Sequence, residues 1–175
     1  MKPSPLHFTT LQRSLHWGMA AAILAMLFIG VGMVSTVRPI YLRLLATHEV
    51  LGLAILVLAL IRLITRLREG APCLPPDLPA ALKFAAIASQ CLLYLLMFAM
   101  PLLGWAMLSS ANYPLAVGDW VLPPLVPVNE TLHGWLWMAH VGFGLALFAL
   151  VSLHIAAALF HALVRRDGVF GSMLR

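Results

Sequence analysis

Four long stretches of the 175-residue sequence carry almost no charged residues, and they constrain the fold more than any other feature. They cover roughly residues 14–37, 44–65, 84–108 and 132–164. A helix of about 20 apolar residues crosses the ~30 Å hydrocarbon core of a bilayer. We therefore expect the whole chain, residues 1–175, to fold as a single all-α integral membrane domain, a four-helix bundle.

The composition excludes several other classes of protein. Hydrophobic residues make up 62% of the chain and charged residues 10%, whereas soluble domains carry about 45–50% and about 25%. So few polar residues could not cover the surface of a soluble enzyme, and a disordered chain would be far more polar. Because the net charge of +5 is explained by membrane topology, we expect membrane lipid as a partner and no nucleic acid.

The basic residues predict the orientation, since four spans place both ends of the chain on one side of the membrane. That side would carry Lys2, Arg13, Arg62, Arg66, Arg68, Lys83, Arg165, Arg166 and Arg175. The other side would carry only Arg38 and Arg43. Positive charge is retained in the cytoplasm, so the sequence predicts cytoplasmic termini in a bacterial inner membrane. Glu49 and Arg62 are expected to reach water from the two ends of the second span.

Prolines mark the connections between the spans. Residues 66–83 contain four prolines, and residues 109–131 contain four more in what is predicted to be an extended outer loop. Pro101, inside the third span, predicts a kink. Cys73 and Cys91 are not expected to form a disulfide.

Six of the seven histidines lie within or at the edges of the apolar stretches, where an ionisable side chain is costly and usually functional. His16 lies near the cytoplasmic end of the first span, and His48 near the outer start of the second. His140 and His154 are fourteen residues apart on the fourth span, which is about 21 Å and nearly four full turns. They therefore share one face at two depths. Depth predicts two pairs, His48 with His140 and His16 with His154.

Paired imidazoles in apolar surroundings suit haem better than a bare metal ion. Zinc usually takes four ligands, whereas haem needs only axial ligands and offers an apolar plane to the bundle interior. Two histidines on one iron leave no open position for oxygen, so electron transfer is the expected chemistry. The sequence thus predicts two haems stacked across the bilayer. It contains no CxxCH motif that would attach them covalently.

Several other polar residues have more than one reading. His133 suits a structural or surface role, and His161 suits either a plain interfacial role or a hydrogen bond to a quinone. Arg38 and Arg43 could anchor the outer interface or steer an anion, while Glu49 could tune a haem or cap its helix. Glycines near the predicted ligands could admit a macrocycle, but close helix packing is the simpler explanation. They are Gly30, Gly32, Gly52, Gly142 and Gly144.

Together these features resemble the bacterial cytochrome b561 family of four-helix di-haem membrane proteins, over nearly the whole chain. The likeness rests on Leu15-His16-Trp17, His48 with Gly52, the Arg62–Arg66 end of the second span, the stretch around Tyr94, Pro101 to Gly104, and the spacing of His140, His154 and His161. The resemblance implies two b-type haems held axially by His16, His48, His140 and His154.

One branch of that family is a superoxide:ubiquinone oxidoreductase, which takes electrons from superoxide at the periplasmic face and reduces ubiquinone within the membrane. The resemblance implies a place near the quinone for His161. The chain departs from that branch at Gln90, where the branch has a histidine, and in the outer loop. The donor and the quinone contacts therefore stay open.

The leading hypothesis is an oxidoreductase that moves electrons from a periplasmic donor, superoxide among the candidates, to ubiquinone. The alternative is a cytochrome b subunit that relays electrons to or from a separate periplasmic redox partner through the outer loop. A transporter with a histidine relay would need more acidic residues inside the spans than this sequence has. A purely structural membrane protein gives no reason for the placement of the histidines.

Overall fold

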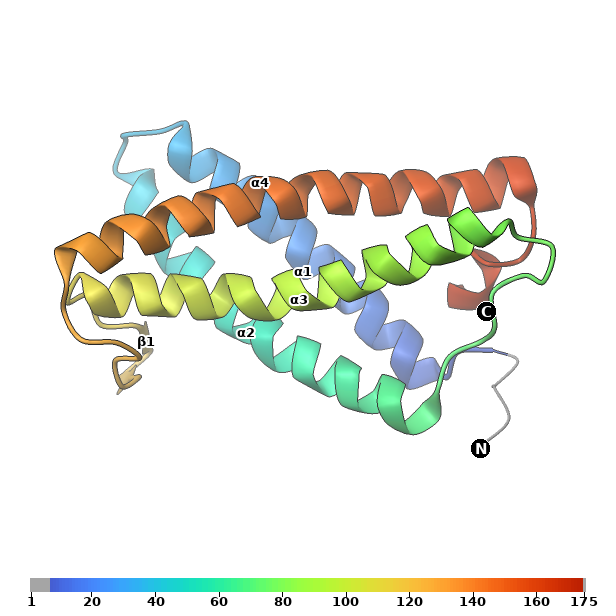
Figure 1. Ribbon diagram of the computed structural model, residues 1–175. Coiled ribbons are helices and arrows are strands. Elements are labelled where there is room, and N and C mark those ends of the chain that lie inside the picture. The colour runs from blue at the N-terminus through green and yellow to red at the C-terminus, as the bar shows by residue number, and fades with distance from the viewer. Residues whose placement is uncertain (1–6, 175) are drawn as a thin grey trace.

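The computed structural model describes residues 7–174, and four long helices dominate it (Figure 1). Their bounds are α1 Thr10–Val34, α2 Ile40–Glu69, α3 Ala80–Ser110 and α4 Glu130–Phe160. A π-helical turn, His161–Arg165, continues α4, and a 3-10 helix follows at Gly171–Met173. All four long helices have the length and hydropathy needed to cross a membrane. The prediction of an all-helical fold with four long apolar helices is confirmed.

The helices begin and end where local chemistry favours it. The Thr9 side chain accepts a hydrogen bond from the Gln12 backbone N–H, and the Gln12 side chain accepts one from the Thr9 N–H, which caps α1 reciprocally. At the start of α4 the Asn129 side chain accepts one hydrogen bond of 2.9 Å from the Leu132 backbone N–H, a simple N-cap. Gly70 ends α2 with a φ of +78°, a conformation that glycine adopts without steric cost. Its carbonyl accepts a hydrogen bond from Gln12 Nε2 at 2.8 Å, which joins the start of α1 to the end of α2.

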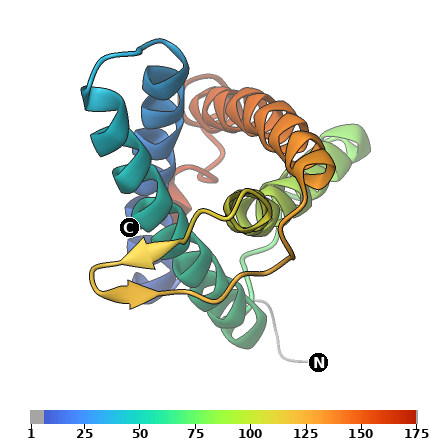
Figure 2. The same cartoon turned by 90° about the vertical axis from the view of Figure 1, so that its left-hand side faces the viewer.

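The helices pack in a chain of neighbours rather than as a closed square. α1 packs against α2, α2 against α3, and α3 against α4, whereas α4 makes few close backbone approaches to α1 or α2. Figure 2 shows α1 and α2 on one side, α4 on the other, and α3 between α2 and α4. Only side chains therefore reach from α4 toward the α1–α2 pair. α3 continues through Pro101 without interruption, and its ribbon changes direction part-way along (Figure 1).

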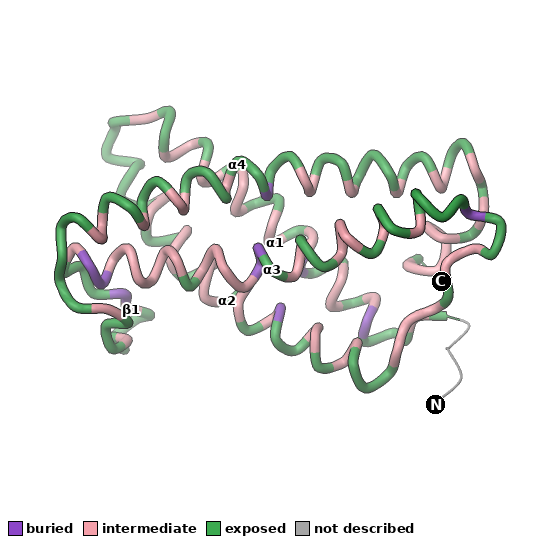
Figure 3. Tube along the Cα trace, viewed as in Figure 1, coloured by how far each residue is buried: buried purple, intermediate pink, exposed green. Residues whose placement is uncertain are grey.

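Most large apolar side chains face outward. Phe28 is 69% exposed and Leu145 is 70% exposed, while full burial is limited to a few contacts such as those of Met19, Ala59 and Met97. Figure 3 shows the buried positions as isolated points on otherwise accessible helices. Water would not tolerate such a surface, but lipid tails solvate it, since the helices satisfy their backbone hydrogen bonds internally.

The loop between α3 and α4 carries a feature that the sequence does not predict. Within it lies a two-residue antiparallel hairpin, β1 Ala116–Val117 with β2 Trp120–Val121. Gly118 opens the turn with a φ of +61°, as the first central position of such a tight turn requires. We call this end of the bundle the hairpin end. We call the opposite end, where α1 and α3 begin and α2 and α4 end, the basic end.

Candidate functional site

The first predicted pair meets toward the hairpin end. The rings of His48 on α2 and His140 on α4 have centroids 6.0 Å apart and planes inclined by 65°. The Nδ1 atoms of both rings are buried and make no hydrogen bond within the described part of the chain. Two glycines line the pair. A Cβ added at Gly104 would lie only 3.3 Å from Cε1 of His140, and one at Gly30 would lie 4.0 Å from Cε1 of His48.

The second pair meets toward the basic end. The rings of His16 on α1 and His154 on α4 have centroids 6.3 Å apart and planes inclined by 66°. Trp17 packs edge-on against His16, with ring centroids 5.3 Å apart. Its indole Nε1–H donates a hydrogen bond of 2.9 Å to the backbone carbonyl of Met173, so the C-terminal segment lies over this pair.

Both separations suit two imidazoles on one metal. With a metal–nitrogen bond of about 2 Å and a ring radius of about 1 Å, ligands on opposite sides of an ion have ring centroids about 6 Å apart. The buried Nδ1 atoms of His48 and His140 have no hydrogen-bonding partner within the described residues, and such costly unsatisfied groups are typical of functional or ligand-binding sites. The residues present therefore fit a group that needs two axial imidazoles.

A bare metal ion fits less well. Among residues 7–174, no group of three or more His, Cys, Asp and Glu side chains could hold a metal ion. A structural zinc site needs four such ligands, whereas a planar macrocycle supplies four of its own. The limited approach of α4 to α1 and α2 also suits a flat group that lies between helices.

The family is shown by comparison with known proteins. A family sequence model described as prokaryotic cytochrome b561 matches residues 7–175. The chain belongs to the prokaryotic cytochrome b561 family. Membership of the family gives the chain its general function. The chain is a haem b-binding electron-transfer protein that crosses the bacterial inner membrane several times.

Individual relatives are similar over most of their length. "Cytochrome b561 homolog 1" of Escherichia coli (strain K12) is 28% identical over 134 residues, which are 77% of this chain and 76% of that protein. "Probable superoxide oxidase CybB" of Yersinia pestis is 28% identical over 127 residues, which are 73% of this chain and 72% of that protein. "Cytochrome b561 homolog 2" of Escherichia coli (strain K12) is 24% identical over 182 aligned positions, which cover 98% of this chain and 93% of that protein.

The structure also places other polar residues that the sequence of this cytochrome b561 family member singles out. His133 Nδ1 lies 3.0 Å from the backbone carbonyl of Met107, a structural role that links α4 to α3. Arg38 and Arg43 are exposed at the hairpin end. Glu49 does not cap its helix, because α2 has no acidic residue in its first turn and no side-chain cap. Cys73 and Cys91 are free.

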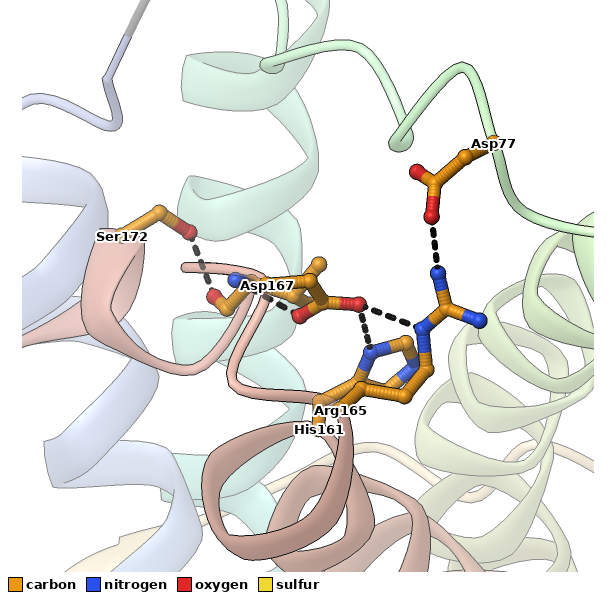
Figure 4. Close-up of polar contacts among 6 residues, drawn as sticks. Asp77, His161, Arg165, Asp167 and Ser172 are labelled. Carbon is orange, nitrogen blue, oxygen red and sulfur yellow. Dashed lines mark hydrogen bonds and ion pairs between the residues drawn. The ribbon is translucent and has the colours of Figure 1, made fainter.

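His161 lies at the basic end in a polar cluster that the sequence did not reveal (Figure 4). Its Nδ1 is 2.7 Å from Oδ2 of Asp167, which also accepts a hydrogen bond of 2.9 Å from Arg165 Nε. Arg165 then reaches Asp77, in the loop before α3, at 2.6 Å. Arg166 has a φ of +53°, and this turn brings Asp167 back to His161, a contact that hydropathy cannot anticipate. The cluster fastens the C-terminal segment to the α2–α3 loop.

The hydrogen bonds set the ionisation of Asp167. Burial alone would raise the pKa of its carboxyl, but the bonds from His161 and Arg165 outweigh burial and hold the pKa below its usual value. The ionised cluster therefore stabilises the C-terminal segment above the ordinary carboxyl pKa of about 4, and this contribution is lost as the pH falls through the lower folded-state pKa.

Replacing Asp167 by Asn is expected to loosen residues 166–173 at neutral pH. Hydrogen bonds to charged groups contribute about 1.5–3 kcal/mol, so amide hydrogen exchange there should quicken by about tenfold or more. In the wild type the same loosening should appear only in acid, and D167N should lose this acid transition. Exchange measured by mass spectrometry, corrected for the intrinsic pH dependence, checks both results. Equal protection in the two proteins at neutral pH would contradict the role assigned to the cluster.

Proposed function

We propose that the chain holds two b haems and transfers electrons from a periplasmic donor to ubiquinone, as an oxidoreductase. The observation that carries the proposal is the pair of facing histidines at each of two depths of the bundle. His16 and His154 would hold one haem, and His48 and His140 the other. When bound, the haems would supply one-electron redox chemistry at two levels of the bilayer.

The distribution of basic residues supports an orientation for this activity. Among the residues that the structure describes, Arg13, Arg66, Arg68 and other Lys and Arg residues lie at the basic end, whereas Arg38 and Arg43 alone lie at the hairpin end. Positive charge is retained in the cytoplasm. The hairpin end would then face the periplasm, and the His48–His140 pair would lie nearer to the donor.

We place the electron acceptor, ubiquinone, at the basic end in this proposal. A hollow of about 280 Å³ beside His161 is also lined by Arg166, Phe170 and neighbouring residues. Its size approaches that of small-molecule pockets, about 300–1,000 Å³, and its lining combines an aromatic face with polar groups. These features support His161 as a hydrogen-bonding partner of a quinone carbonyl, although Asp167 already engages its Nδ1.

Superoxide is the donor that we test first. Arg38 and Arg43 are exposed at the hairpin end, and exposed cations raise the encounter rate of a small anion. A relative with 28% identity carries the name "Probable superoxide oxidase CybB", which supports the same choice.

Purified protein in detergent or liposomes should reduce ubiquinone faster in the presence of a superoxide source than a haem-free control does. The variant R38Q/R43Q should slow the reaction several-fold at low salt, and the difference should shrink at high salt because screening removes steering. Quinone reduction is followed by absorbance, with superoxide dismutase added as a control. A rate no higher than that of the haem-free control would refute the superoxide version.

A protein donor is the second candidate, because the hairpin loop exposes large side chains. Trp120 is 80% exposed and Tyr113 is 66% exposed, and exposed aromatic residues are frequent in protein contacts. Cross-linking from position 120 in whole cells, followed by purification, should then recover one defined partner protein. Full activity with small molecules alone would favour the first candidate.

A further inference from the structure

Arg62 is a cation inside the bundle that has no anionic partner among the described residues. The sequence predicts that it reaches water from the end of its span, but in the structure it is only partly accessible and lines an internal cavity. Within the described residues its side chain donates a single, long hydrogen bond, 3.5 Å from NH1 to the backbone carbonyl of Gln12. Among residues 7–174, the ion pairs involve only Asp77, His161, Arg165 and Asp167, so no carboxylate of the described chain neutralises Arg62.

Such an arrangement demands an anion. A guanidinium group stays protonated in proteins, so Arg62 cannot escape the cost of burial by losing its charge. Removing a cation from water without pairing it with an anion is strongly unfavourable. Arg66, one turn further along α2, differs because it donates a hydrogen bond of 2.9 Å to Gln90 Oε1. The described structure therefore leaves one of the two neighbouring arginines to be satisfied by something other than the protein.

A second unsatisfied group faces the same place. The hydroxyl of Tyr94 on α3 is buried and makes no hydrogen bond within the described chain. Tyr94 and Arg62 both line a small cavity, together with Gln12, Arg66 and residues of the two terminal segments. A phenol O–H and a guanidinium are both hydrogen-bond donors, and two donors around one space suit an acceptor with more than one oxygen, such as a carboxylate.

The place is next to one ring pair. NH1 of Arg62 lies 3.5 Å from the backbone carbonyl of Gln12, which is one helical turn before His16 on α1, and the His16 ring faces that of His154. A haem held by these two histidines carries two propionate groups at one edge of its macrocycle. The six acidic residues of the chain contribute no carboxylate to Arg62, whereas the cofactor would bring its own.

We propose that Arg62, assisted by the Tyr94 hydroxyl, binds a propionate of the haem held by His16 and His154 and thereby raises the reduction potential of that haem. The inference rests on the proposed function, because it requires a haem at this pair. A cation beside the macrocycle stabilises the form that carries one more electron. Arg62 is thus a positioning residue, and the bidentate geometry of guanidinium with carboxylate favours arginine over lysine.

The test is a potentiometric titration of the purified holoprotein and three variants of α2, followed by haem absorbance. In R62Q the midpoint potential of one haem should become more negative while the other keeps its value, and that haem should be lost more easily on dilution. In R62K the midpoint potential should shift less, because lysine keeps the positive charge but cannot donate two parallel hydrogen bonds to a carboxylate. R68Q removes the same charge from an exposed position on the same helix and should leave both potentials unchanged.

A second experiment distinguishes a propionate from other anions, such as a lipid phosphate, as the group that Arg62 binds. Wild-type protein and R62Q are reconstituted with the dimethyl ester of haem, which has no ionised propionates. If Arg62 acts through a propionate, the ester should lower the wild-type potential and largely abolish the difference between the two proteins. An R62Q effect of equal size with haem and with its ester would overturn the proposal. So would unchanged potentials and haem retention in both R62Q and R62K.

These results are distinguishable from failure of the proposed function. If H16A and H154A keep their full haem content, the ligand assignment is wrong whatever R62Q does. If those variants each lose one haem while the Arg62 variants behave like the wild type, the haem site stands and only the propionate contact is rejected. Y94F provides an independent check, with a smaller negative shift expected for the same haem.

Discussion

H154A is expected to lose one of two haems and to keep the other. His154 would supply one axial ligand toward the basic end, and its ring centroid lies 6.3 Å from that of His16, whereas the second pair is separate. An alanine cannot coordinate iron, and loss of one of only two protein ligands removes most of the affinity. The haem-to-protein ratio should fall from about two to about one, as measured by pyridine haemochrome absorbance against protein concentration.

In the matched variant H140A the haem-to-protein ratio should also fall to about one, but the other haem should be lost. The haems that remain in H140A and H154A should therefore differ in midpoint potential and spectrum. His133 offers a control on the same helix, since its Nδ1 lies within hydrogen-bonding distance of the Met107 carbonyl rather than facing a second imidazole. H133A should retain both haems. Full haem content in both H140A and H154A would show that the axial ligands lie elsewhere.

Replacing Gly104 by Leu should remove the haem of the hairpin end while sparing the other. A Cβ added at this position would lie only 3.3 Å from Cε1 of His140, which is tighter than ordinary van der Waals contact. Leucine adds three more carbon atoms, and the packed interior accommodates such growth only by displacing neighbours. The His140 ring would therefore leave its position facing His48. We expect a haem-to-protein ratio of about one, and G104A should show a milder loss.

Gly134 provides the control for this prediction. It lies on α4, where an added Cβ would meet nothing within 4 Å, so G134L should keep both haems. The spectrum and redox titration of G104L identify which haem is lost, because the remaining one should match the haem retained in H140A. Retention of both haems in G104L, with the wild-type potentials, would contradict the role assigned to this glycine.

The helices were predictable from sequence because lipid imposes a simple requirement. Any span needs about 20 apolar residues, and the ranges 14–37 and 84–108 fall largely within α1 and α3. The pairing of histidines was predictable for a related reason. A helix rises a constant distance per residue, so depth alone indicated that His154 should meet His16 rather than His48.

Rotation and side-chain direction were not predictable in the same way. Hydropathy is nearly uniform around these helices, and it therefore did not indicate that Arg62 lines an internal cavity instead of reaching water. The bond between Asp167 and His161 depends on a backbone reversal at Arg166, which no periodic pattern encodes. The closeness of Gly104 to His140 is a tertiary contact between α3 and α4, so sequence spacing alone could not reveal it.

The most direct measurement is the reduced-minus-oxidised absorption spectrum of the purified, folded protein, taken together with its haem-to-protein ratio. Two histidine pairs at two depths predict the spectrum of six-coordinate b haems and a ratio of about two. A colourless protein that is nevertheless folded, or a ratio of about one that neither H48A nor H140A lowers or alters spectrally, would contradict the account.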